Sequence, residues 1–193
     1  MFIKPMRIIA GKFRGRKLKS PPSLQTRPTS DRLRETLFNI LAPRIAGARV
    51  LDLCAGTGAV GIEALSRGAI HVTFVDQSRK MQVLIEENLN AFSIEEREIE
   101  IVTSEASDFL RKLVKKATEP FDIIFFDPPY ASDYEIVFEY IGEHATEVLA
   151  KAGVLIVEHD KKKEPREEVG QMKRYRVVKQ GDSSLSFYER TRN

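Results

Sequence analysis

The chain has 193 residues, 42% of them hydrophobic, and a net charge of +3, which is sufficient for a folded core. No apolar run approaches the roughly 20 residues that span a bilayer, and Lys4 and Arg7 interrupt any secretory signal, so membrane and exported proteins are disfavoured. The single cysteine, Cys54, and three scattered histidines predict a cytoplasmic protein without disulfides or a bound metal.

Positive charge is concentrated at the N-terminal end. Eight of the 31 basic residues precede Asp31, the first acidic residue, and the remaining 23 are outnumbered by 28 acidic residues. Residues 7–18 mix apolar, glycine and basic residues in a pattern typical of a β-hairpin, which favours an ordered arm over a solvated tail. We therefore predict an arm of residues 1–30 that contacts phosphates, followed by a domain of residues 31–193. The residues expected to contact phosphates are Arg7, Lys12, Arg14, Arg16, Lys17, Arg27, Arg32 and Arg34.

Strand and helix patterns alternate after the arm. A helix is expected from Ser30 or Asp31, where either residue could serve as the N-cap, to about Leu41. Strands are predicted near residues 49–54, 71–75, 98–103, 121–126 and 153–158, with helices near 59–67, 78–92, 106–116 and 133–149. This alternation predicts a doubly wound, Rossmann-like α/β fold with a mostly parallel sheet. Residues 173–180 and 184–190 add an antiparallel hairpin, which gives seven strands.

A glycine-rich loop follows the first predicted strand. Gly56, Gly58 and Gly61 satisfy the G-x-G-x-x-G fingerprint, and Asp76 ends the next strand, where it could bind a ribose or cap a helix. Asp52 would repel the pyrophosphate of a dinucleotide but attract the ammonium and sulfonium groups of S-adenosylmethionine. Capping of the next helix is the alternative role of Asp52. We expect S-adenosylmethionine to be bound by Asp52, Ala55, Gly56, Gly58, Asp76, Glu105 and Ala106.

The sequence Asp127-Pro128-Pro129-Tyr130 follows the fourth predicted strand. The first and fourth strands of a doubly wound sheet are neighbours, so this segment should emerge beside the glycine-rich loop. The Asp127 carboxylate and the Pro128 carbonyl could accept hydrogen bonds from both N–H groups of an aromatic amine and direct its lone pair at a methyl donor. Tyr130 could stack on the base, and Asp127 could take the released proton. We expect Asp127, Pro128, Pro129 and Tyr130 to form the catalytic site.

Several stretches together resemble one known family. They are the arm of residues 7–18 and the segments at residues 27–39, 51–59, 63–68 and 127–130. The chain is similar to the RsmD family of bacterial methyltransferases, in which Phe often stands at the position of Tyr130. The resemblance implies a seven-stranded methyltransferase sheet, S-adenosylmethionine as the methyl donor, and the exocyclic N2 of a guanine in 16S ribosomal RNA as the target. It also implies an assembled or partly assembled small ribosomal subunit as the substrate, and we expect the enzyme to be a monomer.

Other functions remain open on the residues alone. An N6-adenine methyltransferase or a protein-glutamine methyltransferase could use the same amine site, although the basic arm favours RNA over protein. A ribosome-assembly factor that binds RNA without turnover is the non-enzymatic alternative. A nicotinamide dehydrogenase would have to tolerate Asp52, and a nucleophilic role for Cys54 has no neighbouring base in the sequence to support it.

Overall fold

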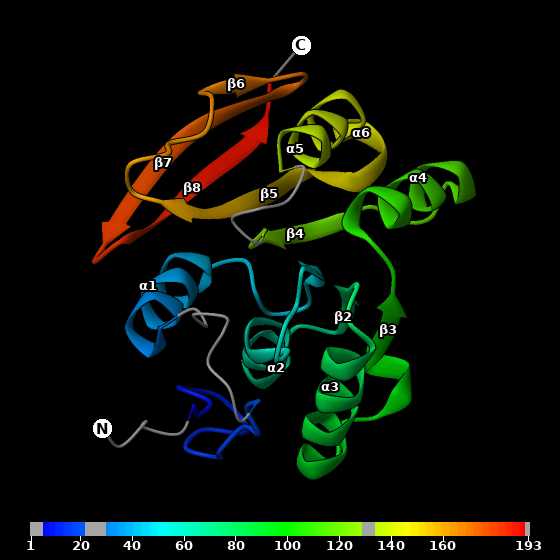
Figure 1. The fold of residues 1–193 in the computed structure, drawn as a ribbon, viewed down its shortest axis with the longest axis vertical. Helices are drawn as coiled ribbons and strands as arrows, with labels where there is room; N and C mark the ends of the chain where they lie inside the picture. Colours follow the sequence, from blue (N-terminus) through cyan, green and yellow to red (C-terminus); the bar gives the residue numbers. More distant parts are fainter. Residues whose placement is uncertain (1–5, 22–29, 129–133, 192–193) are drawn as a thin grey trace. The chain divides into compact units, whose positions relative to one another are not determined.

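Parallel strands with helical crossovers form the first part of the chain. The computed structural model describes residues 6–21, 30–128 and 134–191, and the chain divides into two units, Met1–Thr103 and Ser104–Asn193. In the first unit, β1 (Arg49–Leu53), β2 (His71–Asp76) and β3 (Ile99–Thr103) pair in parallel in the order β3-β2-β1 (Figure 1). The helices of this unit are α1 (Asp31–Leu41), α2 (Ala59–Ser66) and α3 (Arg79–Phe92), with a short 3-10 helix at Glu96–Glu98.

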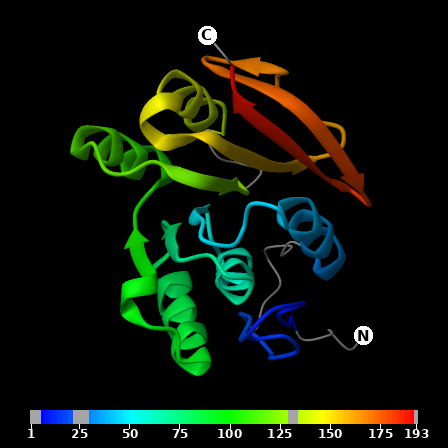
Figure 2. The same cartoon turned by 180° about the vertical axis from the view of Figure 1, so that it is seen from behind.

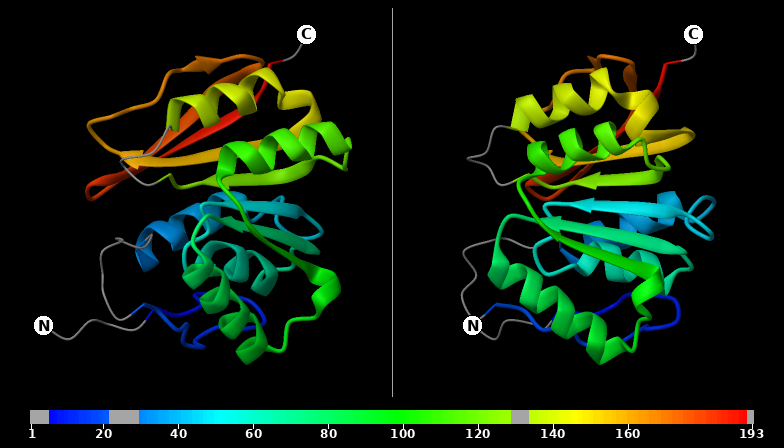
Figure 3. Two further views of the ribbon diagram at one scale, coloured as in Figure 1. Left: turned by 45° about the vertical axis from the view of Figure 1, so that its right-hand side comes forward. Right: turned by 90° about the vertical axis from the view of Figure 1, so that its right-hand side faces the viewer.

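The second unit joins parallel and antiparallel strands. Its elements are α4 (Ala106–Lys116), β4 (Phe121–Phe126), α5 (Tyr134–Glu143), α6 (Ala145–Val148), β5 (Leu149–Asp160), β6 (Glu168–Val169), β7 (Met172–Gln180) and β8 (Ser183–Arg190). β4 and β5 are parallel, whereas β5, β8, β7 and β6 follow one another in antiparallel pairs. The β7–β8 hairpin is seen from behind in Figure 2, and α4 and α5 lie side by side in Figure 3.

These elements confirm the predicted α/β class with its C-terminal antiparallel hairpin, and differ from the prediction in three places. The two-residue strand β6 was not expected, and it pairs with β7. The helix predicted near residues 133–149 is divided at His144, and β5 begins at Leu149 instead of near residue 153. The predicted pairing of the first and fourth strands joins the two units and stays a prediction.

The N-terminal arm is a compact turn and not a ladder of two strands. One isolated antiparallel bridge joins Arg7 to Lys17, and the Leu18 N–H donates to the Met6 carbonyl at 2.9 Å. The expected hairpin is therefore short: the Ile8 N–H still donates across it to the Arg16 carbonyl at 3.0 Å, whereas the N–H groups of Ile9 and Ala10 donate to Glu63 on α2. Met6, Ile8, Phe13 and Leu18 are buried, so the arm packs as part of the first unit. The boundary predicted at residue 30 remains a prediction.

No helix in the described part of the chain combines the length and apolar character needed to cross a membrane.

Candidate active site

The glycine-rich loop after β1 is held in a tight turn by β2. The N–H groups of Cys54 and Ala55 both donate to the Val75 carbonyl at 2.9 Å. Cys54, Gly56 and Gly58 all have positive φ, at 69°, 55° and 74°. A Cβ added at Gly56 would meet no atom within 4 Å, so the turn leaves room for a ligand to approach its backbone. This cradle fits the expected cofactor, and we call residues 52–58 the cofactor loop.

Asp52 is buried at the base of this loop. The side chain is 2% exposed, and its Oδ2 atom accepts a hydrogen bond from the Gly61 N–H, in the first turn of α2, at 2.9 Å. Burial raises the pKa of Asp52 to about 7; the Gly61 hydrogen bond opposes this change and the nearby Asp76 adds to it. The carboxylate therefore caps α2, and its charge depends on pH near neutrality. Its predicted contact with a cofactor cation stays a prediction.

Asp76 organises the same loop from the end of β2. Its Oδ2 accepts from the Gly56 N–H at 2.9 Å, and its Oδ1 accepts from the Ser78 N–H at 2.8 Å, just before α3. One carboxylate thus fixes both the cofactor loop and the start of a helix. Each carboxylate oxygen can accept a further hydrogen bond, so the structure leaves capacity for the predicted ribose contact.

The remaining residues of the predicted cofactor and catalytic sites belong to the second unit. Glu105 is the N-cap of α4 without a side-chain capping bond, and Ala106 is the first helical residue. Asp127 and Pro128 directly follow the buried residues of β4, as expected, and are themselves half-buried. Pro129 and Tyr130 lie outside the described residues. The proposed amine site is therefore described only in its first half.

The arm presents basic side chains to solvent. Arg7, Lys12, Arg14 and Lys17 of the arm, and Arg32 on α1, are all exposed, as expected for phosphate contacts. Arg27 lies outside the described residues.

Two predicted RNA contacts have roles within the fold. The Arg16 guanidinium donates to the Ala91 carbonyl and lies 4.4 Å from the Phe92 ring, which fastens the arm to the end of α3. Arg34 was expected to face RNA, but its side chain is 0% exposed. Its Nη2 atom donates to the Arg7 carbonyl at 2.6 Å and to Asp31 at 3.0 Å. The structure therefore corrects the placement of Arg34, whose charge is used inside the protein.

A buried carboxylate that the sequence analysis did not identify anchors the arm. Glu63, on α2, accepts from the N–H groups of Ile9 at 2.7 Å and Ala10 at 3.0 Å, and from Arg67 Nε at 2.7 Å. One turn later, Ser66 Oγ donates to the Ala10 carbonyl at 2.6 Å and accepts from the Phe13 N–H at 2.9 Å. Glu63 and Ser66 are polar residues on an otherwise apolar helix, and this pattern could have indicated a buried polar contact.

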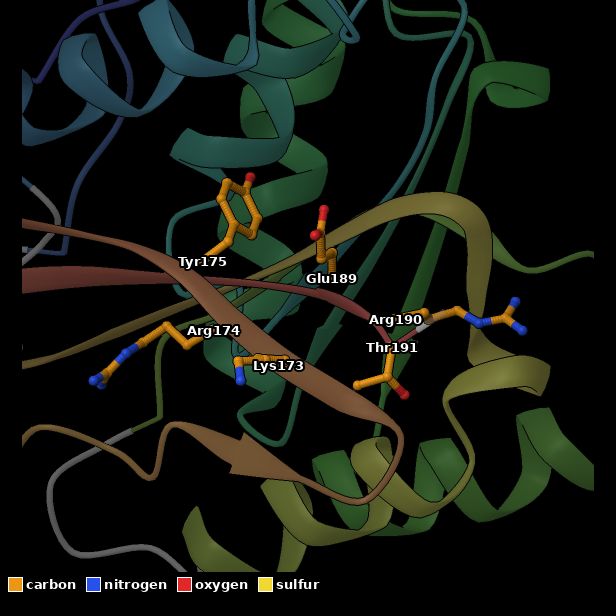
Figure 4. A pocket seen from close by; sticks show the side chains of 6 residues that line it. All are labelled: Lys173, Arg174, Tyr175, Glu189, Arg190 and Thr191. Carbon is orange, nitrogen blue, oxygen red and sulfur yellow. The ribbon is translucent and has the colours of Figure 1, made fainter. Parts of the chain in front are cut away.

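A shallow pocket of about 370 Å³ lies elsewhere, on the second unit. Strands β7 and β8 and the residue after them line it (Figure 4), through Lys173, Arg174, Tyr175, Glu189, Arg190 and Thr191. None of the predicted site residues belongs to it. Within the described ranges, no three potential ligand side chains are grouped as a metal site requires.

Comparison with known proteins connects these features to a family. A family model described as "Conserved hypothetical protein 95" matches residues 6–189. "Putative rRNA methyltransferase YlbH" of Bacillus subtilis is 35% identical over 186 residues, which cover 96% of this chain and 99% of that protein. "Ribosomal RNA small subunit methyltransferase D" of Escherichia coli is 46% identical over 125 residues, 65% of this chain and 60% of that protein.

Solved structures agree with the fold. "Putative methyltransferase yhhF" from Escherichia coli has a TM-score of 0.84 at 32% identity, covering 98% of this chain and 100% of that one. "Putative methylase HI0767" from Haemophilus influenzae has a TM-score of 0.76 at 29% identity, covering 98% of this chain and 100% of that one. These similarities extend through both units and confirm the predicted Rossmann-like methyltransferase fold.

Proposed function

Because the chain belongs to the RsmD family of S-adenosylmethionine-dependent methyltransferases, we propose that it methylates the exocyclic N2 amino group of one guanine in 16S ribosomal RNA. We further propose that an assembled or partly assembled small subunit is the substrate. The observation that carries the choice of RNA is the match to YlbH, which is named an rRNA methyltransferase, over nearly the full length of both chains.

The first unit supplies the methyl-donor site. Asp52, Ala55, Gly56, Gly58 and Asp76 would hold S-adenosylmethionine, with Glu105 and Ala106 of the second unit beside the adenine. The open approach to Gly56 and the buried carboxylate of Asp52 support this assignment. Bound there, S-adenosylmethionine supplies a methyl group made electrophilic by its sulfonium.

Residues after β4 act on the target amine. The Asp127 carboxylate and the Pro128 carbonyl accept hydrogen bonds from the two N–H groups of the amine. These bonds favour a pyramidal nitrogen with its lone pair directed at the methyl group. Pro129 and Tyr130 complete the proposed amine site, Pro129 because it has no backbone N–H to donate and Tyr130 by stacking on the base. Asp127 then accepts the proton that the methylated amine releases. The exposed cations of the arm hold the RNA backbone.

Labelled nucleosides provide the test. Small subunits from cells that lack this protein are incubated with the purified chain and isotopically labelled S-adenosylmethionine, and their nucleosides are examined by mass spectrometry. We expect labelled N2-methylguanosine from subunits and little from deproteinised 16S RNA.

Labelled N6-methyladenosine would instead show that the same amine chemistry acts on another base. Label in protein glutamine would move the substrate to protein. Equal labelling of naked RNA and subunits would contradict the particle as the required substrate.

A further inference from the structure

One buried amide side chain contacts both the arm and the cofactor loop. Asn88, on α3, is 1% exposed. Its Oδ1 accepts a hydrogen bond from the Lys19 N–H at 2.8 Å, and its Nδ2 donates to the Lys19 carbonyl at 3.2 Å. The same Nδ2 donates to the carbonyl of Thr57, between the two glycines of the cofactor loop, at 3.2 Å.

The partners of Asn88 require an amide at this position. Lys19 offers one donor and one acceptor, and Thr57 offers a second acceptor, so the orientation of the amide is fixed by its partners. A carboxylate would bring an oxygen against two carbonyl groups. An apolar side chain would leave the Lys19 N–H without this partly buried hydrogen bond.

A second contact joins the arm to the same loop residue. The Thr57 hydroxyl donates to the Met6 sulfur at 3.7 Å, and Met6 is buried. The loop also packs closely against α3, because a Cβ added at Gly58 would lie 3.2 Å from the Ile85 side chain. Thr57 thus contacts Met6 of the arm directly and Lys19 of the arm through Asn88.

We propose that Asn88 is a positioning residue that couples the arm to the cofactor loop. A ligand that orders the loop makes the Asn88 bonds harder to break, and therefore also holds the arm in place. By thermodynamic linkage, a docked arm must strengthen ligand binding by the same factor. When S-adenosylmethionine is bound, the arm presents Lys12, Arg14 and Lys17 in a fixed arrangement, and the enzyme therefore binds RNA more tightly. This part of the inference rests on the proposed function.

Hydrogen exchange of the full chain tests the coupling without any reaction. Exchange of the amides in residues 6–21 is followed by mass spectrometry with and without saturating S-adenosylhomocysteine. We expect the ligand to slow exchange in the arm by about fivefold or more, the lower end of typical coupling between sites. In Asn88→Ala this ligand dependence should fall severalfold, with the weaker Met6–Thr57 contact remaining, and calorimetry should show S-adenosylhomocysteine binding weakened about fivefold, the effect of one lost hydrogen bond.

Ser66→Ala is the matched control. It removes the arm contacts to the Ala10 carbonyl and the Phe13 N–H but no contact to the cofactor loop. Both variants should speed arm exchange in the absence of ligand, whereas Ser66→Ala should keep the response to S-adenosylhomocysteine and nearly the full affinity.

If hydrogen exchange of the arm in the wild-type chain is the same with and without S-adenosylhomocysteine, the proposal is wrong. This test does not depend on whether Asn88→Ala folds. Equal losses of ligand affinity in the two variants would also overturn it. A ligand-dependent arm in a chain that labels no RNA nucleoside would leave the coupling in place and reject the proposed substrate instead.

Discussion

Buried polar side chains gather where the arm and the cofactor loop meet α2 and α3. Asp52, Glu63 and Asn88 each bond to backbone N–H groups of another segment. Such groups are costly to bury unless they are paired, so each one favours a single arrangement of the segments around it. Burial raises the pKa of Asp52 to about 7, and its charge is therefore costly in the folded state.

This cost predicts how Asp52→Asn changes stability with pH. Between its ordinary pKa of 3.8 and about 7, folded Asp52 holds a proton that the unfolded chain releases, so wild-type stability falls as pH rises through that window. An amide can still accept the Gly61 hydrogen bond and carries no charge. We expect Asp52→Asn to raise the free energy of unfolding at pH 8 by about 4 kcal/mol and to have little effect below pH 4, measured by urea unfolding.

The same substitution should weaken S-adenosylhomocysteine binding at pH 8 by about tenfold, because it removes the charge expected to attract the ligand's ammonium. Asp108→Asn, at an exposed position on α4, is the control and should change neither quantity appreciably. A variant that binds the ligand at full strength would reduce Asp52 to a helix-capping role.

The arm gains its order from the helices beneath it. Gly11 shows how close this docking is: its φ is +80°, and an added Cβ would lie 1.8 Å from the Ser66 carbonyl oxygen. Phe13 packs edge-on against Phe92 at 5.2 Å between ring centroids. The exposed cations are therefore mounted on a fixed turn, and their contribution to RNA binding can be separated from the role of Arg16 in docking.

We expect the combined substitutions Lys12→Ala, Arg14→Ala and Lys17→Ala to weaken RNA binding and flatten its salt dependence. Each lost phosphate contact should reduce the slope of log affinity against log salt concentration by about 0.7 to 0.9, so three contacts should reduce it by about 2. Fluorescence titrations of an RNA target at several salt concentrations provide the measurement.

Lys112→Ala, Lys115→Ala and Lys116→Ala remove the same charge from the exposed surface of α4 and serve as the control. Equal slopes for the two triple variants would exclude a specific contact by the arm.

Local patterns predicted most elements because apolar periodicity and turn residues determine them. Ser30 or Asp31 was expected to be the N-cap of the first helix. Ser30 is the N-cap of α1, and its side chain accepts a hydrogen bond from the Leu33 N–H. The division between α5 and α6 was not predictable in this way. The Gly142 carbonyl, near the end of α5, accepts from the Gln171 N–H at 2.9 Å, and a Cβ at Gly142 would lie 2.6 Å from the Val169 carbonyl oxygen. This contact joins residues far apart in the sequence, so no short stretch of sequence could have predicted it.

Some of the site residues were also predictable from the local sequence and others were not. The cofactor loop was identifiable because glycines with positive φ leave a sequence signature, whereas the burial of Arg34 was not. Arg34 lies on the apolar side of α1 among buried residues such as Leu33 and Leu37, and only the carbonyl of Arg7 and the carboxylates of Asp31 and Glu63 explain why a guanidinium is tolerated there. Burial lowers its pKa, and the two carboxylates oppose that change.

Over the whole molecule, the proposed function assigns different tasks to the two units. The first unit contains the cofactor loop and the arm, and the second contains Asp127 and Pro128. The relatives that match nearly the full chain include both units, which is consistent with a reaction that needs both. Substitutions in the cofactor loop and at Asp127 should therefore affect different steps.

Asp127→Ala should lower the rate of methyl transfer by at least about 100-fold, the usual contribution of a positioned acid or base, while S-adenosylhomocysteine affinity changes less than about twofold. Asp127→Asn keeps an acceptor for the amine but cannot take its proton, so it should retain substrate binding and still be slow. Asp52→Asn should show the opposite pattern, with weakened ligand binding. Single-turnover methylation and calorimetry on the same preparations separate these effects, and an unchanged rate in Asp127→Ala would remove this residue from the amine site.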